Sequence, residues 1–341
     1  MMNELIDLTM FSRGGQGIMY GLLVVSVLLG VSGIINLLWP RSVLERPTAW
    51  AMIAVNIIFL AGFFWICRLH YQIYCQLPLE MSESMVSWFN NYMQCSAGSG
   101  LPLLDPSRPI RYTVPLWIEN EKYYFWFMCY SIMALVVHFR ITNHRLRALL
   151  HLVLSGQILI MFFAADPFTQ PLPKFFSEIQ PWFAGSQTSV DRLRIFMQLY
   201  PRMTYYYNAS YMWIHPPMLF LSYACITITF VTSIFMLGVR DMTIENTGYD
   251  FAKLGFVLLT LGMLLGYPWA LQAWGENWWW DPKICSSIMM WSIYSTYLHT
   301  RLYVVRSGMW YFTAVMGILC FVSMVFTLLS SLYFPGEHSL Q

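Results

Sequence analysis

The sequence contains little charge. Charged residues make up 11% of its 341 residues, whereas a soluble globular domain carries about 25%. Hydrophobic residues make up 57%, and the mean hydropathy is +0.52. A soluble chain of this size needs far more charge to cover its surface, so the composition excludes an ordinary soluble enzyme. The formal net charge of +2 implies no nucleic-acid-binding surface.

Paired cysteine motifs, internal repeats and low-complexity tracts are also absent. The 7 cysteines are scattered, with no CxxC and no zinc-ligand spacing. The first apolar run is too long for the core of a signal peptide and lacks a small-residue cleavage site. The sequence therefore predicts a single integral-membrane domain over residues 1–341, with two long connections, 68–122 and 166–211, as its only bulk outside the membrane.

Long apolar segments are abundant instead. A helix needs roughly 20 apolar residues to cross a bilayer. Eight segments have this character: 17–39, 49–67, 123–139, 146–165, 212–238, 251–272, 284–304 and 310–332. The third is short, and the seventh contains Ser and Tyr. The expected fold is an all-α polytopic transmembrane helical bundle of about eight spans.

Arginine residues predict how this bundle lies in the membrane. Eight spans place both termini on one side and the odd-numbered connections on the other. Those short connections carry Arg41, Arg46, Arg140, Arg145, Arg147, Arg240, Arg301 and Arg306. Because short cytoplasmic loops collect Lys and Arg, we expect both termini, both long connections and segment 273–283 to be extracytoplasmic. The predicted location is a bacterial-type inner (cytoplasmic) membrane.

Segment 273–283 is rich in tryptophan. It contains Trp274, Trp278, Trp279 and Trp280, followed by Asp281, Pro282 and Lys283. One interpretation is an aromatic belt at the membrane interface, but a belt needs only one or two Trp per span. The pattern favours a shelf for a flat aromatic ligand, with Lys283 or indole N–H groups meeting carboxylates at its rim. A porphyrin with two propionates is such a ligand.

Two histidines share the predicted outer face with this segment. His215 opens the fifth span, and His338 follows the eighth. Two neutral imidazoles on opposite sides of a porphyrin would ligate its iron. The alternatives are that His215 is simply a helix-start residue before Pro-Pro, where proline is favoured, and that His338 is a solvated tail residue.

Other histidines lie inside predicted spans. His299 lies roughly 24 Å along the seventh span at 1.5 Å per residue, and an ionisable residue at such a place is a functional-site hypothesis. His138 reaches a similar depth in the third span, so the two could hold a second haem. Alternatively, His138 lies at the inner interface, and His151 competes for its role. His144 is expected to be solvated, and His70 has no explanation.

Several motifs resemble one known family. WGENWWWDPK, residues 274–283, resembles the tryptophan-rich "WWD" signature of the haem-handling proteins of cytochrome c biogenesis. YSTYLHTR and the terminal GEHS are similar to the CcsA/ResC branch of this family. WIHPPMLFLSYA, DPFTQPLP and WIENEKYYFW resemble the CcmF branch. The resemblance covers about residues 117–341, and segment 273–283 is its most specific part.

The resemblance implies roles for individual residues. His215 and His338 match the two outer haem ligands, His299 matches a transmembrane haem ligand, and the Trp-rich segment matches the platform that presents haem. The implied function is delivery of haem b across the membrane and its attachment to the CxxCH thiols of apocytochrome c, as a component of a haem lyase or synthase. A CcsB-like membrane partner is expected to supply the parts of the attachment machinery that this chain lacks. Membrane lipid is a further expected partner.

The sequence also departs from the family pattern. Ile284 and Cys285 follow the Trp-rich motif where Glu is usual, and Leu340 stands where Tyr is usual. No counterpart of the large soluble domain of CcsB is present. Two other functions therefore stay open: a haem exporter or chaperone without attachment activity, and a bis-His haem electron-transfer subunit. Electron-transfer subunits usually hold both ligands inside the bundle and lack an exposed Trp-rich loop.

Two cysteines, Cys75 and Cys95, fall in the first long outer connection. An oxidising compartment permits a disulfide between them, which would close a loop of about 20 residues worth around 3 kcal/mol. Two unpaired thiols are the alternative.

Overall fold

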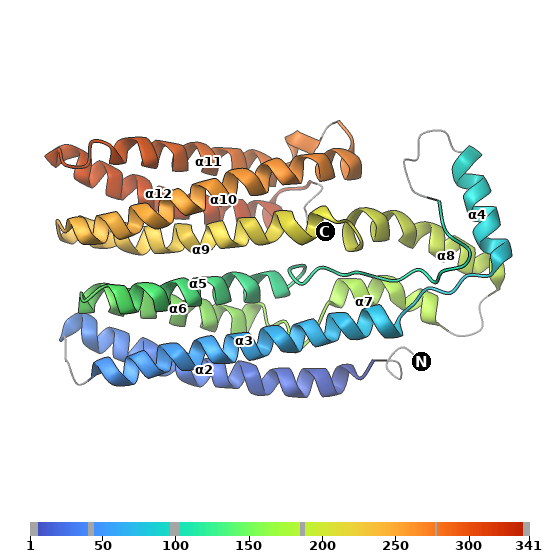
Figure 1. Ribbon diagram of the computed structural model, residues 1–341, viewed down its shortest axis with the longest axis horizontal. Helices are drawn as coiled ribbons and strands as arrows, with labels where there is room; N and C mark the ends of the chain where they lie inside the picture. Colours follow the sequence, from blue (N-terminus) through green and yellow to red (C-terminus); the bar gives the residue numbers. More distant parts are fainter. Residues whose placement is uncertain (1–5, 40–43, 96–102, 185–187, 277, 337–341) are drawn as a thin grey trace.

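The computed structural model describes residues 6–39, 44–95, 103–184, 188–276 and 278–336, and these are mostly helical (Figure 1). The long helices are α2 (Leu8–Leu38), α3 (Glu45–Gln76), α5 (Glu121–Arg140), α6 (His144–Ala164), α9 (Tyr211–Gly238), α10 (Met242–Trp274), α11 (Pro282–Arg301) and α12 (Ser307–Tyr333). Shorter elements are α4 (Glu83–Cys95), α7 (Pro173–Ile179), η2 (Gln180–Phe183), α8 (Ser189–Arg202), η3 (Met203–Tyr207) and η4 (Trp278–Trp280). The all-α prediction is confirmed.

Each of the eight predicted spans coincides with one long helix. Six of the described helices are long and apolar enough to cross a membrane: α2, α3, α6, α9, α10 and α12. The chain is therefore an integral membrane protein. The other two, α5 and α11, have 20 residues each and contain more polar side chains. Helix α5 is packed against α3, α6 and α9, so it meets protein rather than lipid and can carry such residues. The count of eight spans stays a prediction.

The connections between the helices alternate between the two ends of the bundle, as expected. Helices α2, α5, α9 and α11 end, and helices α3, α6, α10 and α12 begin, at one end of the bundle (Figure 1). Helices α4, α7 and α8 and the connection between α10 and α11 lie at the other, which we call the outer end. The start of α2 and the finish of α12 lie there too. The side of the membrane that the outer end faces stays a prediction.

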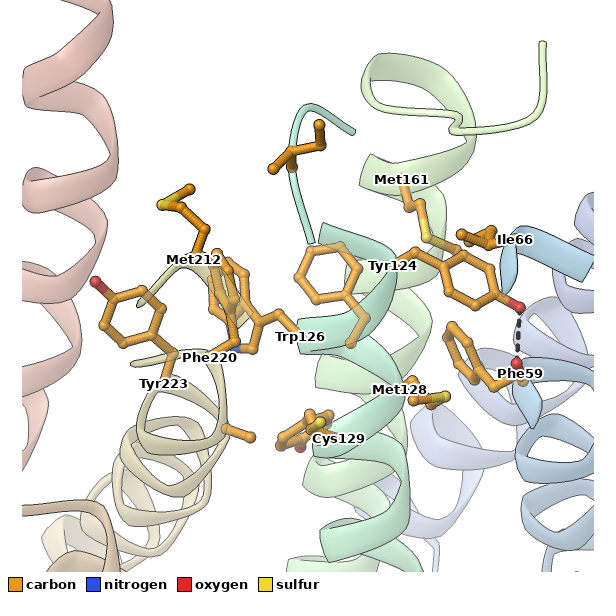
Figure 2. Packing of buried hydrophobic residues seen from close by; sticks show 14 of the residues in the cluster. Phe59, Ile66, Tyr124, Trp126, Met128, Cys129, Met161, Met212, Phe220 and Tyr223 are labelled. Carbon is orange, nitrogen blue, oxygen red and sulfur yellow. Dashed lines mark hydrogen bonds between the residues drawn. The ribbon is translucent and has the colours of Figure 1, made fainter. Parts of the chain in front are cut away.

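Helix α9 connects the two halves of the bundle. It packs against α10 and α12 on one side and against α5 on the other. Trp126 of α5 meets Tyr223 of α9 edge-to-face, with ring centroids 5.8 Å apart (Figure 2). On the far side of α5, the Tyr124 hydroxyl donates a hydrogen bond of 3.0 Å to the Phe59 carbonyl of α3. One continuous core therefore runs through both halves.

A buried ion pair fixes α10 to α11 at the end opposite the outer end. The Glu245 side chain is completely buried, and its two oxygens accept hydrogen bonds from Arg301 at 2.9 and 3.2 Å. The same guanidinium donates to the Asn246 side chain at 2.7 Å and lies 4.1 Å from the ring centre of Tyr249. A buried carboxylate without a partner would be costly, so these contacts set the register of the two helices.

The two cysteines of the first outer connection are unpaired. Cys75 is the penultimate residue of α3, and Cys95 is the last residue of α4. Both side chains are exposed as free thiols. The structure therefore agrees with the alternative of two thiols rather than a disulfide.

The arrangement predicts opposite labelling of two exposed positions. In a variant lacking the exposed cysteines Cys75, Cys95 and Cys285, we expect Glu276→Cys to react with a membrane-impermeant maleimide added to intact cells. Val305→Cys, 85% exposed in the turn at the opposite end, should react only after the membrane is opened. The reverse pattern would contradict the predicted orientation.

Candidate functional site at the outer end

The Trp-rich segment forms a tight turn between α10 and α11. Helix α10 ends at Trp274, and Gly275 follows with a φ of +75°, a conformation that glycine adopts without strain. Asp281 then caps α11, and its carboxylate accepts hydrogen bonds from the backbone N–H groups of Lys283 and Ile284 at 2.9 and 3.4 Å. Pro282 occupies the first helical position, where its missing N–H costs nothing.

The four tryptophans of this segment divide into two pairs. Trp274 packs edge-to-face against Trp269, with ring centroids 4.7 Å apart, and Trp278 meets Tyr267 at 5.2 Å. Trp279 and Trp280 stack on each other at 4.1 Å and are exposed. The tryptophans therefore form an inner pair that lines the bundle and an outer pair that faces away, rather than one continuous shelf.

The imidazole of His215 is held in a defined orientation. Its Nδ1 donates a hydrogen bond of 2.7 Å to the Gly262 carbonyl of α10. Because the proton is then on Nδ1, the Nε2 atom carries a free lone pair and can act as a ligand. The ring stacks on Trp269, with centroids 6.2 Å apart and planes 25° from parallel. A Cβ atom on Gly266 would lie only 2.7 Å from the ring, so this position needs glycine.

The proline that follows His215 leaves one backbone carbonyl of α9 free to accept a hydrogen bond from outside the helix. Pro216 has no N–H, so the carbonyl of Met212 lacks its donor within the helix. The indole N–H of Trp117 donates to that carbonyl at 2.5 Å. Trp117 also meets Trp213 edge-to-face at 5.7 Å. The segment before α5 is thereby attached to the first turns of α9, next to His215.

His215 borders two adjoining cavities of about 120 and 130 Å³, both open to the outside. Both are lined by His215, Leu219, Tyr223, Trp269 and Lys283. The first, which we call the polar chamber, is also lined by Trp117, Glu119, Lys122, Tyr206 and Ser331. The second, the apolar chamber, lies between α10 and α11 and is also lined by Met263, Tyr267, Trp278, Ile284 and Ile288. The lining combines aromatic and apolar side chains with two lysines, which suits a ligand with both apolar and anionic parts.

Two further groups give the polar chamber its hydrogen-bonding character. Burial raises the pKa of Glu119, although its carboxylate accepts two backbone N–H groups, from Lys174 and Phe175, at the start of α7. Burial, followed by the nearby Glu119 carboxylate, raises the pKa of the Tyr206 hydroxyl to about 12. Tyr206 is therefore neutral around pH 7.

Several predicted site residues are thus brought together. His215, Lys283 and Trp278 line one cavity, Trp274 supports it through Trp269, and Asp281 caps the helix that carries Lys283. His338 lies outside the described residues. Gly336, two residues earlier in the sequence, lies against this site, because a Cβ atom there would be 2.6 Å from an Asp281 carboxylate oxygen.

His299 and His138 are not brought together. His138 of α5 lies 3.1 Å from His151 of α6, between Nδ1 and Nε2, and both side chains are buried. His299 is exposed on α11, where its Nδ1 donates to the Ser295 carbonyl at 2.8 Å. Helix α9 lies between α5 and the pair formed by α11 and α12 (Figure 1). His151, the competitor considered from the sequence, is the partner of His138.

Sequence reasoning missed Trp269, Gly262, Gly266 and Lys122. The motif GMLLG, residues 262–266, could have indicated a close helix approach, since small residues four apart allow two helices to come near each other. His70 is buried, and its Nδ1 donates to the Val114 carbonyl at 2.9 Å, which accounts for it as a structural residue.

The fold and this cavity define a class: a polytopic membrane protein with a histidine presented among tryptophans at one end of the bundle. The sequence profile of the family described as "Cytochrome C assembly protein" matches residues 117–338, which include every element of the site. The chain belongs to this family.

Curated relatives resemble the chain over a short stretch. The cytochrome c biogenesis protein CcsA of Cyanidium caldarium is 48% identical over 60 residues, 18% of this chain and 20% of the relative. CcsA of Thermosynechococcus vestitus is 45% identical over 60 residues, 18% of this chain and 19% of the relative. The matched part thus spans about a fifth of these relatives.

A solved structure resembles nearly the whole chain. The cytochrome c haem lyase CcmF has a TM-score of 0.62 and covers 94% of this chain, which corresponds to 47% of the CcmF chain. Its sequence identity is 17%, so this likeness establishes the fold alone.

The close packing of His215 on Gly266 generates a test. Gly266→Ala should displace the imidazole, because the added carbon would lie 2.7 and 2.8 Å from two of its ring atoms. Under the sequence-based expectation that His215 ligates haem, the purified variant should contain severalfold less haem and have a shifted absorption spectrum. Gly156→Ala, at a helical glycine of α6 with open space around it, is the matched control. Equal haem content in both variants would contradict this role for His215.

Proposed function

We propose that this protein binds haem b at its outer end and presents it for covalent attachment to apocytochrome c, within cytochrome c maturation. The observation that carries the proposal is the His215 imidazole, whose Nδ1 is bonded to the Gly262 carbonyl and whose Nε2 is left free among aromatic side chains. This donor set suits haem: a neutral imidazole for the iron, indole faces for the ring, and Lys283 for a carboxylate.

The second ligand on the outer side is proposed to be His338. The family profile ends at that residue, and Gly336 lies against Asp281 beside the cavity. With haem bound, each cysteine S–H of the substrate's CxxCH motif would add across a vinyl C=C bond. The sulfur forms the thioether and the proton goes to the other vinyl carbon. The protein's contribution is to hold the reacting groups close together, since such positioning lowers the barrier.

A CcsB-like partner is proposed to cover helix α11. The side chains of Ser292, Thr296 and His299 are exposed along one face of this helix. The Ser292 and Thr296 hydroxyls donate to carbonyls of their own helix, at 3.0 and 2.9 Å, so the His299 Nε2 is the polar atom on this face that another helix would serve. The Nε2 atom of His299 is free to ligate iron, and His138 is already engaged by His151. The second ligand of an iron bound to His299 would therefore come from the partner.

Histidine substitutions test the outer site. We expect His215→Ala and His338→Ala to lose most of their haem or to shift its spectrum, because the iron loses a ligand. Added imidazole should restore binding by filling the vacant position. Pyridine haemochrome assays on purified protein measure the effect. His144→Ala, which removes an exposed imidazole paired with Glu45 at the opposite end of the bundle, should behave as wild type. Wild-type haem content and cytochrome maturation in both outer variants would contradict the proposal.

Expression in a host without its own maturation system tests the partner. The chain alone should yield a haem-containing membrane protein but little covalent cytochrome c, and co-expression with a CcsB-like protein should restore maturation. His299→Ala should lower total haem loading, while His144→Ala, at the first residue of α6 and outside the proposed interface on α11, should not. Abundant covalent cytochrome c from the chain alone would rule out the partner requirement.

A further inference from the structure

Two lysines from distant parts of the sequence line the cavity beside His215. Lys122 lies in the first turn of α5, and Lys283 lies in the first turn of α11. Lys283 borders both chambers, whereas Lys122 borders only the polar chamber. Two lysines from separate elements thus line the cavity that His215 also lines.

The carboxylates near these lysines are Glu119 and Glu121 for Lys122 and Asp281 for Lys283, and among the described residues none forms a direct ion pair with them. Both oxygens of Glu119 accept backbone N–H groups of α7, at 2.9 and 3.0 Å, and Asp281 caps α11. Within the described part of the chain, neither ammonium group has a carboxylate oxygen within 4.0 Å. Lys122 Nζ lies instead 5.2 Å from the centre of the Tyr123 ring. Two partly buried cations without ion-pair partners favour an anionic ligand.

The rest of the cavity is arranged asymmetrically around these charges. Glu119 and Tyr206 accompany Lys122 in the polar chamber, whereas Met263, Tyr267 and Ile288 line the apolar chamber beyond Lys283. A ligand that fills both chambers must be anionic along one edge and apolar along the other. Haem has this form, because its propionates are on two adjacent pyrroles and its vinyl groups are on the other two.

We propose that Lys122 and Lys283 each bind one propionate of haem, so that the propionate edge lies in the polar chamber and the vinyl edge lies in the apolar chamber beneath Trp278. This inference rests on the proposed function and adds to it a haem orientation and a new residue, Lys122. The vinyl groups then face the gap between α10 and α11, and the substrate's cysteines approach from the side of the Trp-rich segment.

Haem and its dimethyl ester separate charge recognition from shape. The ester keeps the ring, iron and vinyl groups but has no carboxylate. We expect the wild-type protein, in detergent, to bind haem about tenfold or more tightly than the ester, as for loss of charge-assisted hydrogen bonds. Lys122→Ala and Lys283→Ala should each weaken haem binding about tenfold and leave ester binding unchanged. Lys253→Ala, which removes an exposed lysine paired with Asp250 at 2.9 Å, is the matched control.

Each alternative result of these binding measurements would overturn a specific part of the proposal. Equal binding of haem and ester by the wild type, or equal weakening of both by the lysine variants, would overturn the propionate assignment and leave haem binding at His215 intact. Loss of co-purified phospholipid phosphate from the lysine variants, with unchanged haem affinity, would assign the lysines to lipid and also overturn it. Failure of the wild type to bind haem would overturn the proposed function itself.

Discussion

The hydrogen bond from His215 Nδ1 to the Gly262 carbonyl is the constraint on which the outer site depends. It fixes the tautomer of the imidazole and leaves Nε2 unprotonated. The bond requires α9 and α10 to approach closely, and Gly266 allows this because the ring occupies the space where a Cβ would be. Trp269 stacks on the ring, and Trp274 packs on Trp269 in turn. The Trp-rich segment thus contributes to the histidine's position from a distance.

The sequence allowed the helices and their alternation to be predicted, because lipid imposes apolar segments of a set length and short loops carry the positive charge. His215 and Lys283 were also found, because they stand beside Pro-Pro and the Trp-rich motif. Lys122, Gly262 and Trp269 were not, since their roles arise only when α5, α9 and α10 pack together. The division of the four tryptophans is likewise a result of helix geometry: Trp279 and Trp280 follow the turn at Gly275 and face away from the bundle.

Helices α5 and α11 are the two least apolar long helices, for opposite reasons. Helix α5 is enclosed by α3, α6 and α9, so its polar groups meet protein. Helix α11 packs mainly on α12 and leaves Ser292, Thr296 and His299 on its open face. Two helices of similar composition therefore have different surroundings: α5 is an internal helix, and α11 has a polar open face. Hydropathy alone does not separate the two cases, whereas the packing does.

Two side-chain contacts between α10 and α11 restrict how far the apolar chamber can open. The two helices are fixed at Arg301 and Glu245, and again where the Trp291 indole donates to the Thr260 hydroxyl at 2.9 Å. From Trp291 to Pro282, α11 extends about 14 Å without a third such contact among the described hydrogen bonds. This part of α11 is joined instead to α12, where the Ser286 and Ser330 hydroxyls lie 3.1 Å apart. Widening the apolar chamber therefore requires the outer part of α11 either to leave α12 or to carry it along.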